Sequence, residues 1–510
     1  MKGKMIFIDI IYEKMIIKLP KIVNGNVIYS ENDSDLVKLF YPNDVEVHIP
    51  KFTSEDVSQI KEAKQEMNKE LSELTISNIA EFLNDVGNGW LEYRWKGRRL
   101  ASRYSPYVTQ FSDIVTEADF KTMGDFLIQR FHIYDQLEAE LGNERIMDEW
   151  IPKQMCHVRA FPRGLCLHYL VGNLPIAAIY SIIRGIMTKN ITVAKLPSRD
   201  PISSLGFLLS IIETDPNHPI SRSLSAGYWD HKDSIGQDVI DLSDVVCAWG
   251  GYNAMSSIKK MVPPNVPFIE YGPKWSCSVI DLDKCDNDAA AYRVIEDSCF
   301  YDQEACFNTQ RVYVRGNMTE FIERLIYHFR WFSEHVPYCA NNIDISATRN
   351  LAIKEAQYVG CKVIYEKDWA IIVAKHEEKN NITHPFNRTL IIHPVDDFNE
   401  VTPYLDKDNQ SMSVYPWELT NIYRDTWASA GVCRFVELGW SRMFRSGFTH
   451  DGEYKLQQMV RIACIERPWT DRGKYYGLRK NLEEHWFKEL HPGMRKIIDE
   501  RNAKEDRGEI

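Results

Sequence analysis

Residues 165–195 read LCLHYLVGNLPIAAIYSIIRGIMTKNITVAK, and their hydrophobic pattern indicates the fold class. The apolar run Leu165–Val171 is typical of a buried strand, and a tight turn follows at Gly172-Asn173-Leu174-Pro175. Apolar residues then recur at helical spacing over Ile176–Lys189, and a second strand-like run covers Ile191–Lys195. A strand, a crossover helix and a second strand favour a parallel sheet, because parallel neighbours need a long connection.

The alternation of strands and helices continues after residue 195. The further predicted helices are Ile202–Thr214, Asp233–Ile240 and Tyr252–Met261, and the further predicted strands are Leu224–Trp229, Asp244–Trp249 and Val266–Tyr271. Repeated units of this kind form a doubly wound α/β sheet of the Rossmann type, which binds nucleotides at the carboxyl ends of its strands.

Gly250 and Gly251 stand directly between an apolar strand and a predicted helix. Small residues in this place let a pyrophosphate approach the backbone, and the helix N-terminus supplies amide donors. The segment has no GxGxxG motif, so an ordinary turn is the alternative. We take the two glycines as candidate phosphate-binding residues.

The segments outside this region are less regular. Residues 1–50 predict short strands, residues 54–86 and 90–141 predict helices, and residues 149–164 predict a hairpin. The tail from residue 481 is charged and predicted to be helical. The remaining predicted elements are strands Met5–Tyr12, Ile16–Ile22, Val27–Tyr29, Val45–Ile49, Val363–Tyr365, Trp369–Val373, Thr389–Pro394, Met412–Tyr415 and Cys433–Leu438, and helices Thr319–His335 and Ala347–Tyr358.

The composition is that of a soluble globular protein, with 44% hydrophobic and 26% charged residues among 510. Since the net charge is −11 and no basic stripe is present, we expect no binding to nucleic acid. We also expect no membrane span, because Asn173, Pro175 and Arg184 interrupt the apolar segment Leu165–Met187. Eleven cysteines without zinc spacing favour reduced thiols, a cytoplasmic location and no metal site.

Residues 299–314 read CFYDQEACFNTQRVYV and place Cys306 in a turn just before a strand-like run. Reactive groups are usually carried by such connections. Because the thiolate is the reactive form, a catalytic Cys306 would need helix-end amides or a cation to lower its pKa. The alternative is that Cys306 is one more small buried residue.

Four motifs follow one another in a suggestive order. They are Asn173 after a buried strand, Lys195-Leu196-Pro197-Ser198 after the next strand, Glu270-Tyr271-Gly272-Pro273-Lys274 after the last, and then Cys306. This order resembles the aldehyde dehydrogenase superfamily, and it resembles most closely one branch, the LuxC family of acyl-CoA reductases. The segments that carry the closer resemblance are IMDEW (146–150), VGNLP (171–175), AWGG (248–251), YGPK (271–274), FYDQEACF (300–307), VYPWE (414–418), HDG (450–452) and ERP (466–468).

The resemblance implies NADPH-dependent reduction of a long-chain fatty acyl thioester, either acyl-CoA or acyl-protein, to the fatty aldehyde. Cys306 would attack the thioester and carry the acyl group. The Asn173 side-chain amide and the Cys306 backbone N–H would stabilise the oxyanion. The resemblance also implies an aldehyde-dehydrogenase-like fold with a Rossmann-type cofactor domain, an α/β catalytic domain and a β-hairpin oligomerisation arm.

Lys195, Ser198 and Arg199, together with Gly250 and Gly251, are the predicted cofactor-binding residues. In NAD-dependent members of the superfamily a Glu that holds the ribose hydroxyls often stands at the position of Ser198. Ser198 followed by Arg199 removes a carboxylate and adds a guanidinium, which suits the 2′-phosphate of NADPH. The alternative is that Arg199 is a solvated surface charge.

Glu270 is the third candidate catalytic residue, because it matches the carboxylate that activates water in hydrolytic aldehyde dehydrogenases. In a reductase such a base would promote hydrolysis of the acyl-enzyme to fatty acid. Glu270 is therefore expected either to be turned away or to assist acyl transfer. Two alternative functions therefore stay open: an NAD(P)-dependent aldehyde dehydrogenase running in the oxidative direction, and a non-catalytic subunit of a fatty-acid-processing complex. His168 and His450 are weaker site candidates, since a histidine in an apolar strand is more often structural.

The predicted domains follow these patterns. Residues 1–145 form the N-terminal strands and the helical part of the cofactor-binding half, 146–164 the arm, 165–270 the cofactor domain, 271–440 the catalytic domain and 441–510 a C-terminal segment. By the family resemblance, the expected partners are an acyl-protein synthetase and further copies of this chain, in a homo-oligomer or a hetero-complex.

Overall fold

A computed structural model describes residues 14–153, 156–339, 343–374, 382–443, 445–466 and 492–509. The chain divides into two compact units, of which the first comprises Met1–Glu144 and Pro162–Arg461, and the second Arg145–Phe161 and Ile462–Ile510. The predicted strand Met5–Tyr12 and residues 481–491 of the predicted C-terminal helix lie outside the described residues. Within the described ranges, no helix combines the length and the apolarity that crossing a bilayer requires.

The first seven-stranded sheet has the order β12-β11-β8-β9-β10-β2-β3. Its five strands from the alternating region are parallel, as predicted, and the order of the chain reverses between β8 and β11. Two N-terminal strands extend the sheet in antiparallel fashion. The bounds are β2 (Lys21–Val23), β3 (Asn26–Ile28), β8 (Leu165–Tyr169), β9 (Ile191–Lys195), β10 (Leu224–Gly227), β11 (Val245–Trp249) and β12 (Phe268–Tyr271).

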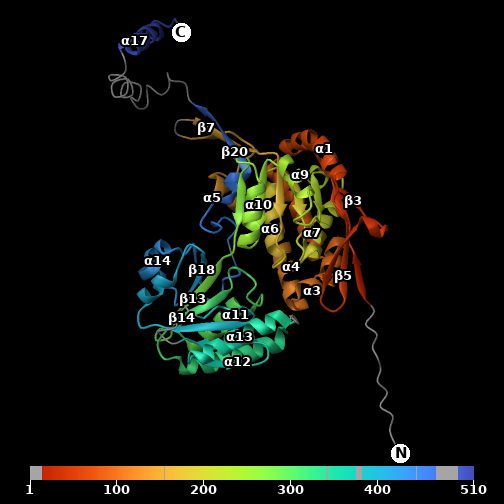
Figure 1. Cartoon of the computed structure of the whole chain (residues 1–510). Coiled ribbons are helices and arrows are strands. Elements are labelled where there is room, and N and C mark those ends of the chain that lie inside the picture. Colours follow the sequence, from red (N-terminus) through yellow and green to blue (C-terminus); the bar gives the residue numbers. More distant parts are fainter. Residues whose placement is uncertain are drawn as a thin grey trace, which may run out of the picture. The chain divides into compact units, whose positions relative to one another are not determined.

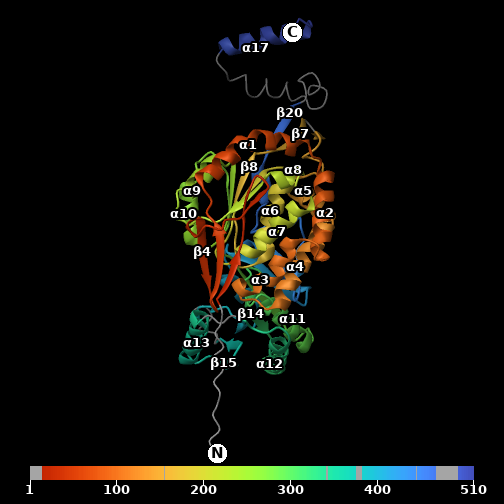
Figure 2. The same ribbon diagram turned by 90° about the vertical axis from the view of Figure 1, so that its right-hand side faces the viewer.

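Helices cover both faces of this sheet, with α6 and α7 on one side and α9 and α10 on the other (Figure 2). Both α6 and α7 begin with a proline, which fits the first helical position because no backbone N–H is needed there. The helices of this half are α1 (Ser54–Glu73), α2 (Ile76–Leu91), α3 (Lys96–Thr109), α4 (Asp113–Ile128), α5 (Phe131–Leu141), α6 (Pro175–Met187), α7 (Pro201–Thr214), α8 (Pro219–Arg222), α9 (Ile235–Leu242) and α10 (Tyr252–Met261).

The helical structure predicted over residues 54–86 is confirmed, and it consists of two helices, because the chain breaks between α1 and α2. Thr75 caps α2: its hydroxyl accepts a hydrogen bond from the Asn78 backbone N–H at 3.1 Å. The Asn78 side chain in turn accepts from the Thr75 backbone N–H at 3.0 Å. This reciprocal capping box satisfies the first amides of a new helix.

The second seven-stranded sheet has the order β15-β16-β17-β14-β13-β18-β19, and all its neighbouring strands are parallel except β15 and β16. Apolar clusters pack α11 and α12 on one face and α13 and α14 on the other; α14 lies across the sheet from α12 in Figure 1. The bounds are β13 (Trp275–Asp281), β14 (Thr309–Arg315), β15 (Lys362–Tyr365), β16 (Ala370–Val373), β17 (Thr389–Pro394), β18 (Asn409–Tyr415), β19 (Arg434–Glu437), α11 (Asn287–Cys299), α12 (Met318–His335), α13 (Ile343–Tyr358) and α14 (Leu419–Ser429).

Two smaller sheets complete the described structure. One has the order β1-β5-β4, with β1 (Met15–Lys18), β4 (Leu36–Tyr41) and β5 (Val45–Pro50). The other has the order β20-β7-β6, with β6 (Ile151–Pro152), β7 (Cys156–Pro162) and β20 (Val460–Glu466). The antiparallel pair β6 and β7 is the predicted hairpin. Helix α17 (Pro492–Asp506) lies in the described part of the tail.

Candidate active site

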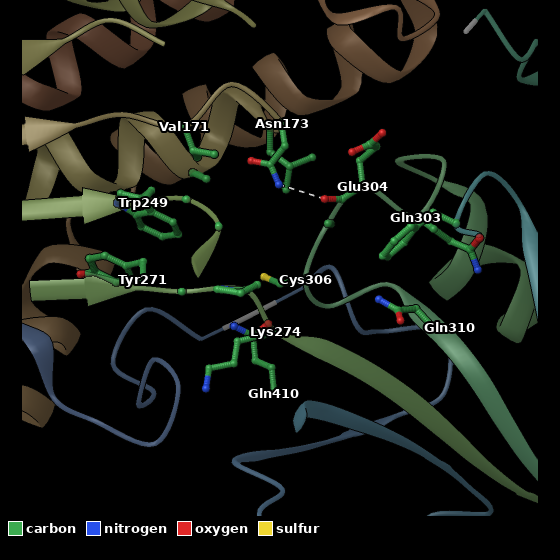
Figure 3. A pocket seen from close by; sticks show the side chains of 18 of the residues that line it. Val171, Asn173, Trp249, Tyr271, Lys274, Gln303, Glu304, Cys306, Gln310 and Gln410 are labelled. Carbon is green, nitrogen blue, oxygen red and sulfur yellow. Dashed lines mark hydrogen bonds between the residues drawn. The ribbon is translucent and has the colours of Figure 1, made fainter. Parts of the chain in front are cut away.

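A cavity of about 540 Å³ lies where β8 and β11 end and where β14 and β18 begin. Asn173 follows β8, Gly250 follows β11, Cys306 precedes β14 and Gln410 stands at the start of β18. Figure 3 shows Asn173 and Cys306 facing the same space, with Trp249 on its border. The first sheet contributes the carboxyl ends of the two strands between which its order reverses, the usual ligand position in a doubly wound sheet.

Residues 300–308, which we call the nucleophile loop, join α11 to β14 and carry Cys306. Asp302 and Gln303 have φ values of +50° and +64°, a left-handed conformation that non-glycine residues rarely adopt. The Asp302 carboxylate forms an ion pair of 2.5 Å with the buried guanidinium of Arg388. The Gln303 amide donates to the Thr389 carbonyl at 2.7 Å and accepts from the Thr389 N–H at 2.8 Å. These contacts offset the backbone strain and hold the loop against β17.

One carboxylate connects the nucleophile loop to the helix that follows Asn173. Asp119 of α4 accepts a hydrogen bond from the Tyr301 hydroxyl at 2.7 Å and another from the Ile176 backbone N–H at 3.1 Å. Asp119 is buried, and this burial raises the pKa of its carboxyl to about 7. Asp119 therefore holds the nucleophile loop and the start of α6 together from outside the cavity.

Asn173 contacts the nucleophile loop directly. Its side-chain Nδ2 donates to the carbonyl of Glu304 at 2.9 Å, two residues before Cys306 (Figure 3). An amide group carries two N–H donors, so this contact orients the group and leaves the second donor for a substrate oxygen. The structure thus brings together the two residues that the sequence pattern proposed for nucleophile and oxyanion donor.

The Cys306 thiol has a pKa raised to about 12, mainly by burial and further by the charge of Asp451. A hydrogen bond from Gln410 and the backbone N–H groups of Cys306 and Phe307 oppose this rise. The expectation that the site lowers the pKa of this thiol is therefore wrong, because desolvation exceeds the effect of the donors. The thiol is therefore protonated at neutral pH.

Glu270 does not line the cavity. It lies on β12, and its carboxylate forms an ion pair of 2.6 Å with Lys259 of α10. Successive residues of a strand point to opposite faces, and the next residue, Tyr271, lines the cavity and stacks on Trp249 with ring centres 3.9 Å apart. Of the two arrangements that the sequence left open for Glu270, the structure has the one turned away.

Gly250 and Gly251 line the cavity at the N-terminus of α10. Gly250 has a φ of +155°, and a Cβ atom placed on Gly251 would meet no atom within 4 Å. The open space beside helix-end amides fits a pyrophosphate group.

The other three predicted cofactor residues do not line this cavity. The Lys195 ammonium lies 4.6 Å from the centre of the Tyr228 ring, and burial lowers its pKa to about 8. The Ser198 carbonyl accepts a hydrogen bond from the Tyr41 hydroxyl. Arg199 forms an ion pair of 2.9 Å with Glu304 of the nucleophile loop, so it is not a free surface charge.

A second, mostly apolar cavity begins at Cys306, which lines both spaces. A third, smaller cavity shares Ile176 and Tyr180 with the second. The second cavity is lined by Leu174, Ile176, Ala177, Tyr180, Trp249, Cys306, Phe307, Gln410, Ser411, Arg434, Phe448 and His450, and the third by Met123, Phe126, Ile176, Ile179, Tyr180 and Ile183. Apolar side chains of α6 thus lead from the sulfur toward α4.

Sequence reasoning missed several residues that line the first cavity. Trp249, Tyr271 and Asp451 belong to motifs that carried the family resemblance, so that signal was present, whereas nothing in the sequence marked Gln410. His450 lines the cavity, but His168 is fully buried and bonds Ser181 of α6.

Residues 71–462 match the family described as acyl-CoA reductase (LuxC). The chain belongs to the LuxC family of acyl-CoA reductases. It is 34% identical over 456 residues to the long-chain acyl-protein thioester reductase of Vibrio harveyi, covering 89% of this chain and 94% of that protein. It is 36% identical over 483 residues to the protein of the same description from Photobacterium phosphoreum, covering 93% and 97%. The LuxC resemblance read from the motifs is confirmed.

Solved structures of aldehyde dehydrogenases share the fold of this LuxC-family chain. Lactaldehyde dehydrogenase from Escherichia coli aligns with a TM-score of 0.69 at 15% identity, covering 89% of this chain and 99% of that one. NADP-dependent glyceraldehyde-3-phosphate dehydrogenase from Bacillus halodurans aligns with a TM-score of 0.67 at 14% identity, covering 88% and 99%. The predicted aldehyde-dehydrogenase-like fold is confirmed.

Proposed function

We propose that the chain reduces a long-chain fatty acyl thioester to the fatty aldehyde, with NADPH as reductant, through an acyl group carried on Cys306. The observation that carries this proposal is the position of Cys306, whose side chain borders both the cavity with the glycine turn and the second, apolar cavity. The names of the two relatives, which are 34% and 36% identical, support the substrate class.

In the first half-reaction the Cys306 sulfur forms a bond to the acyl carbon, and the bond from that carbon to the donor sulfur breaks. The proton of the Cys306 thiol leaves with the donor thiolate. During the attack the acyl oxygen becomes negatively charged, and the free Nδ2–H of Asn173 and the backbone N–H of Cys306 stabilise it. The contact between Asn173 and the Glu304 carbonyl keeps that amide in place beforehand.

NADPH, when bound at Gly250 and Gly251, supplies the hydride that reduces the thioester carbon. Asn173 stabilises the oxyanion a second time. The bond between carbon and the Cys306 sulfur then breaks, the aldehyde leaves and the sulfur regains a proton. The net change is acyl thioester, NADPH and a proton to aldehyde, free thiol and NADP⁺.

The acyl chain is proposed to lie in the two apolar cavities along α6. Burial of each methylene contributes about 0.8 kcal/mol, so an acyl chain that reaches past Tyr180 into the third cavity would bind more tightly than a shorter one. Ala177 lines the space next to Cys306, and Tyr180 stands where the two cavities meet.

The position of Glu270 favours reduction over oxidation, because its carboxylate is held by Lys259 outside the cavity. We expect tetradecanoyl-CoA and NADPH to give tetradecanal, measured by gas chromatography. Glu270→Gln should acylate Cys306 at a rate within about twofold of the unchanged protein, as for other exposed substitutions. Tetradecanoic acid as the main product, formed only when Glu270 is intact, would show that the oxidative alternative is right.

We propose that Arg199 binds the 2′-phosphate of NADPH after leaving Glu304, with Lys195 as a second cofactor-binding residue. Arg199→Met should then raise the KM for NADPH by about tenfold or more, since a charge-assisted hydrogen bond contributes about 1.5–3 kcal/mol, and leave the KM for NADH unchanged. Glu304→Gln releases Arg199 but keeps the carbonyl that Asn173 contacts, so it should lower the KM for NADPH. Preference of the unchanged protein for NADH would contradict the assignment.

We propose that the acyl donor is either acyl-CoA or an acylated partner such as an acyl-protein synthetase.

We propose that the β6–β7–β20 sheet joins copies of the chain. Ile462 and Ile465 of β20 are about half exposed, at 54% and 51%. Exposed apolar side chains on a small three-stranded sheet favour contact with another chain.

A further inference from the structure

Gln410 stands at the start of β18, on the other side of the second sheet's central strand from Cys306. Its side chain lines both cavities together with Cys306 and is one of the donors that oppose the rise in the pKa of the Cys306 thiol. Its Nε2 also donates to Oδ1 of Asp451 at 2.7 Å. An amide nitrogen carries two hydrogens, so one can be held by the carboxylate while the other is directed at sulfur.

The sheet fixes the spacing between the Gln410 backbone and Cys306. The Ser276 hydroxyl of β13 donates a hydrogen bond to the Cys306 carbonyl at 2.7 Å. The Ser276 hydroxyl oxygen also accepts a hydrogen bond from the Ser411 backbone N–H at 3.2 Å. Strand β13 lies between β14 and β18 in the sheet, so one serine bridges the residues that precede β14 and the start of β18. These hydrogen bonds therefore fix the backbone of Gln410 relative to that of Cys306.

Asp451, which accepts the hydrogen bond from that amide, is itself held in a fixed position. It lies in the His450-Asp451-Gly452 turn with a left-handed φ of +55°, and its side chain is only 6% exposed. Its second oxygen lies 3.7 Å from Nε2 of His450, a ring whose pKa is lowered to about 4, chiefly by burial. His450 is therefore neutral at physiological pH and adds no positive charge beside Asp451.

We propose that Gln410 is a catalytic residue, whose N–H stabilises negative charge on the Cys306 sulfur, and that Asp451 is the residue that positions its amide. The inference rests on the proposed function. Sulfur carries negative charge twice in that reaction, when it attacks the acyl carbon and when it is released from the reduced carbon. A fixed donor lowers the barrier of both steps.

Several charged or titratable groups besides Asp451 face the same space, and the test must separate them. Arg434 of β19, His450, Lys274 and Glu304 all line one or both cavities. The negative charge of Asp451 opposes thiolate formation, so removing this residue has two opposite effects. Asp451→Asn removes the charge and keeps an acceptor for Gln410, whereas Asp451→Ala removes both.

The experiment measures how fast iodoacetamide alkylates Cys306 in the full-length protein, between neutral and alkaline pH, by mass spectrometry of the peptide that contains it. This readout needs neither NADPH nor an acyl donor, so its outcome is separate from that of the proposed function. Gln410→Leu should alkylate about tenfold or more slowly at a given pH, because a hydrogen bond to a charged group contributes about 1.5–3 kcal/mol. Asp451→Asn should alkylate faster than Asp451→Ala.

Gln310→Leu is the matched control, since Gln310 lines the same cavity from β14. It should alkylate at the rate of the unchanged protein. In the aldehyde assay, Gln410→Leu should lower kcat and leave the KM for tetradecanoyl-CoA unchanged. Unchanged alkylation of Gln410→Leu, or an equal loss in Gln310→Leu, would overturn the proposal. If Gln410→Leu fails to fold, the comparison of the two Asp451 variants decides, and equal rates for them would overturn it.

Discussion

Replacement of Cys306 by alanine is expected to lower aldehyde formation by about 10⁶-fold, the effect of removing the nucleophile from a covalent mechanism. The loss should be this large because no other residue attacks the acyl carbon, so the oxyanion donors have no developing negative charge to stabilise. The rate is measured as tetradecanal formed from tetradecanoyl-CoA and NADPH. Asn173 and the glycine turn are untouched, so the KM for NADPH should stay within about twofold.

Cys299→Ala is the matched control for this replacement. Cys299 ends α11 and is fully buried in the apolar cluster between that helix and the second sheet. Burial raises the pKa of its thiol to about 12 as well, but this side chain lines neither of the two cavities that Cys306 borders. The variant should keep its activity, and an equal loss in both folded variants would contradict the assignment of Cys306.

Asp302→Ala is expected to destabilise the protein by about 3–5 kcal/mol, the cost of leaving a buried charge without its partner. Arg388 is fully buried, and its Nη1 and Nη2 have no hydrogen-bond partner among the described residues. The rings of Phe332 and Tyr338 face it at 4.9 Å and 5.4 Å. The left-handed backbone at Asp302 adds to the cost, since alanine disfavours it. The free energy of unfolding in urea measures the effect.

Glu366→Ala is the comparison, because it removes an ion pair that is exposed to solvent. Glu366 pairs with Arg330 on the surface, where the two side chains are 43% and 64% exposed. Such pairs contribute about 0–1 kcal/mol, so the variant should unfold almost as the unchanged protein does. Similar losses in the two variants would mean that Asp302 and Arg388 are not a buried pair in solution.

Several strands that are covered on both faces by helices could be predicted from their sequences. β8, β9 and β11 fall within the predicted runs, because parallel strands under two layers of helices have near-continuous apolar sequences. Strand β13 was not predicted, although it is central in its sheet. Its Ser276 and Ser278 hydroxyls look polar in sequence, yet they are buried and bonded to neighbouring strands.

The residues of the site that could be predicted lie in loops next to strand ends. Asn173, Gly250 and Gly251 come after strands that end at the cavity, and Cys306 lies in the loop that faces them. Glu270 and Tyr271 show the limit, since which of two neighbours faces the cavity depends on the register of β12. Gln410 and Cys306 meet through the order β14-β13-β18, which local sequence does not reveal.

The most direct measurement is the intact mass of the protein after incubation with tetradecanoyl-CoA in the absence of NADPH. The account predicts one tetradecanoyl group per chain, mapped by peptide analysis to Cys306 and released as tetradecanal when NADPH is added. An unmodified chain, or an acyl group on any other residue, would contradict it.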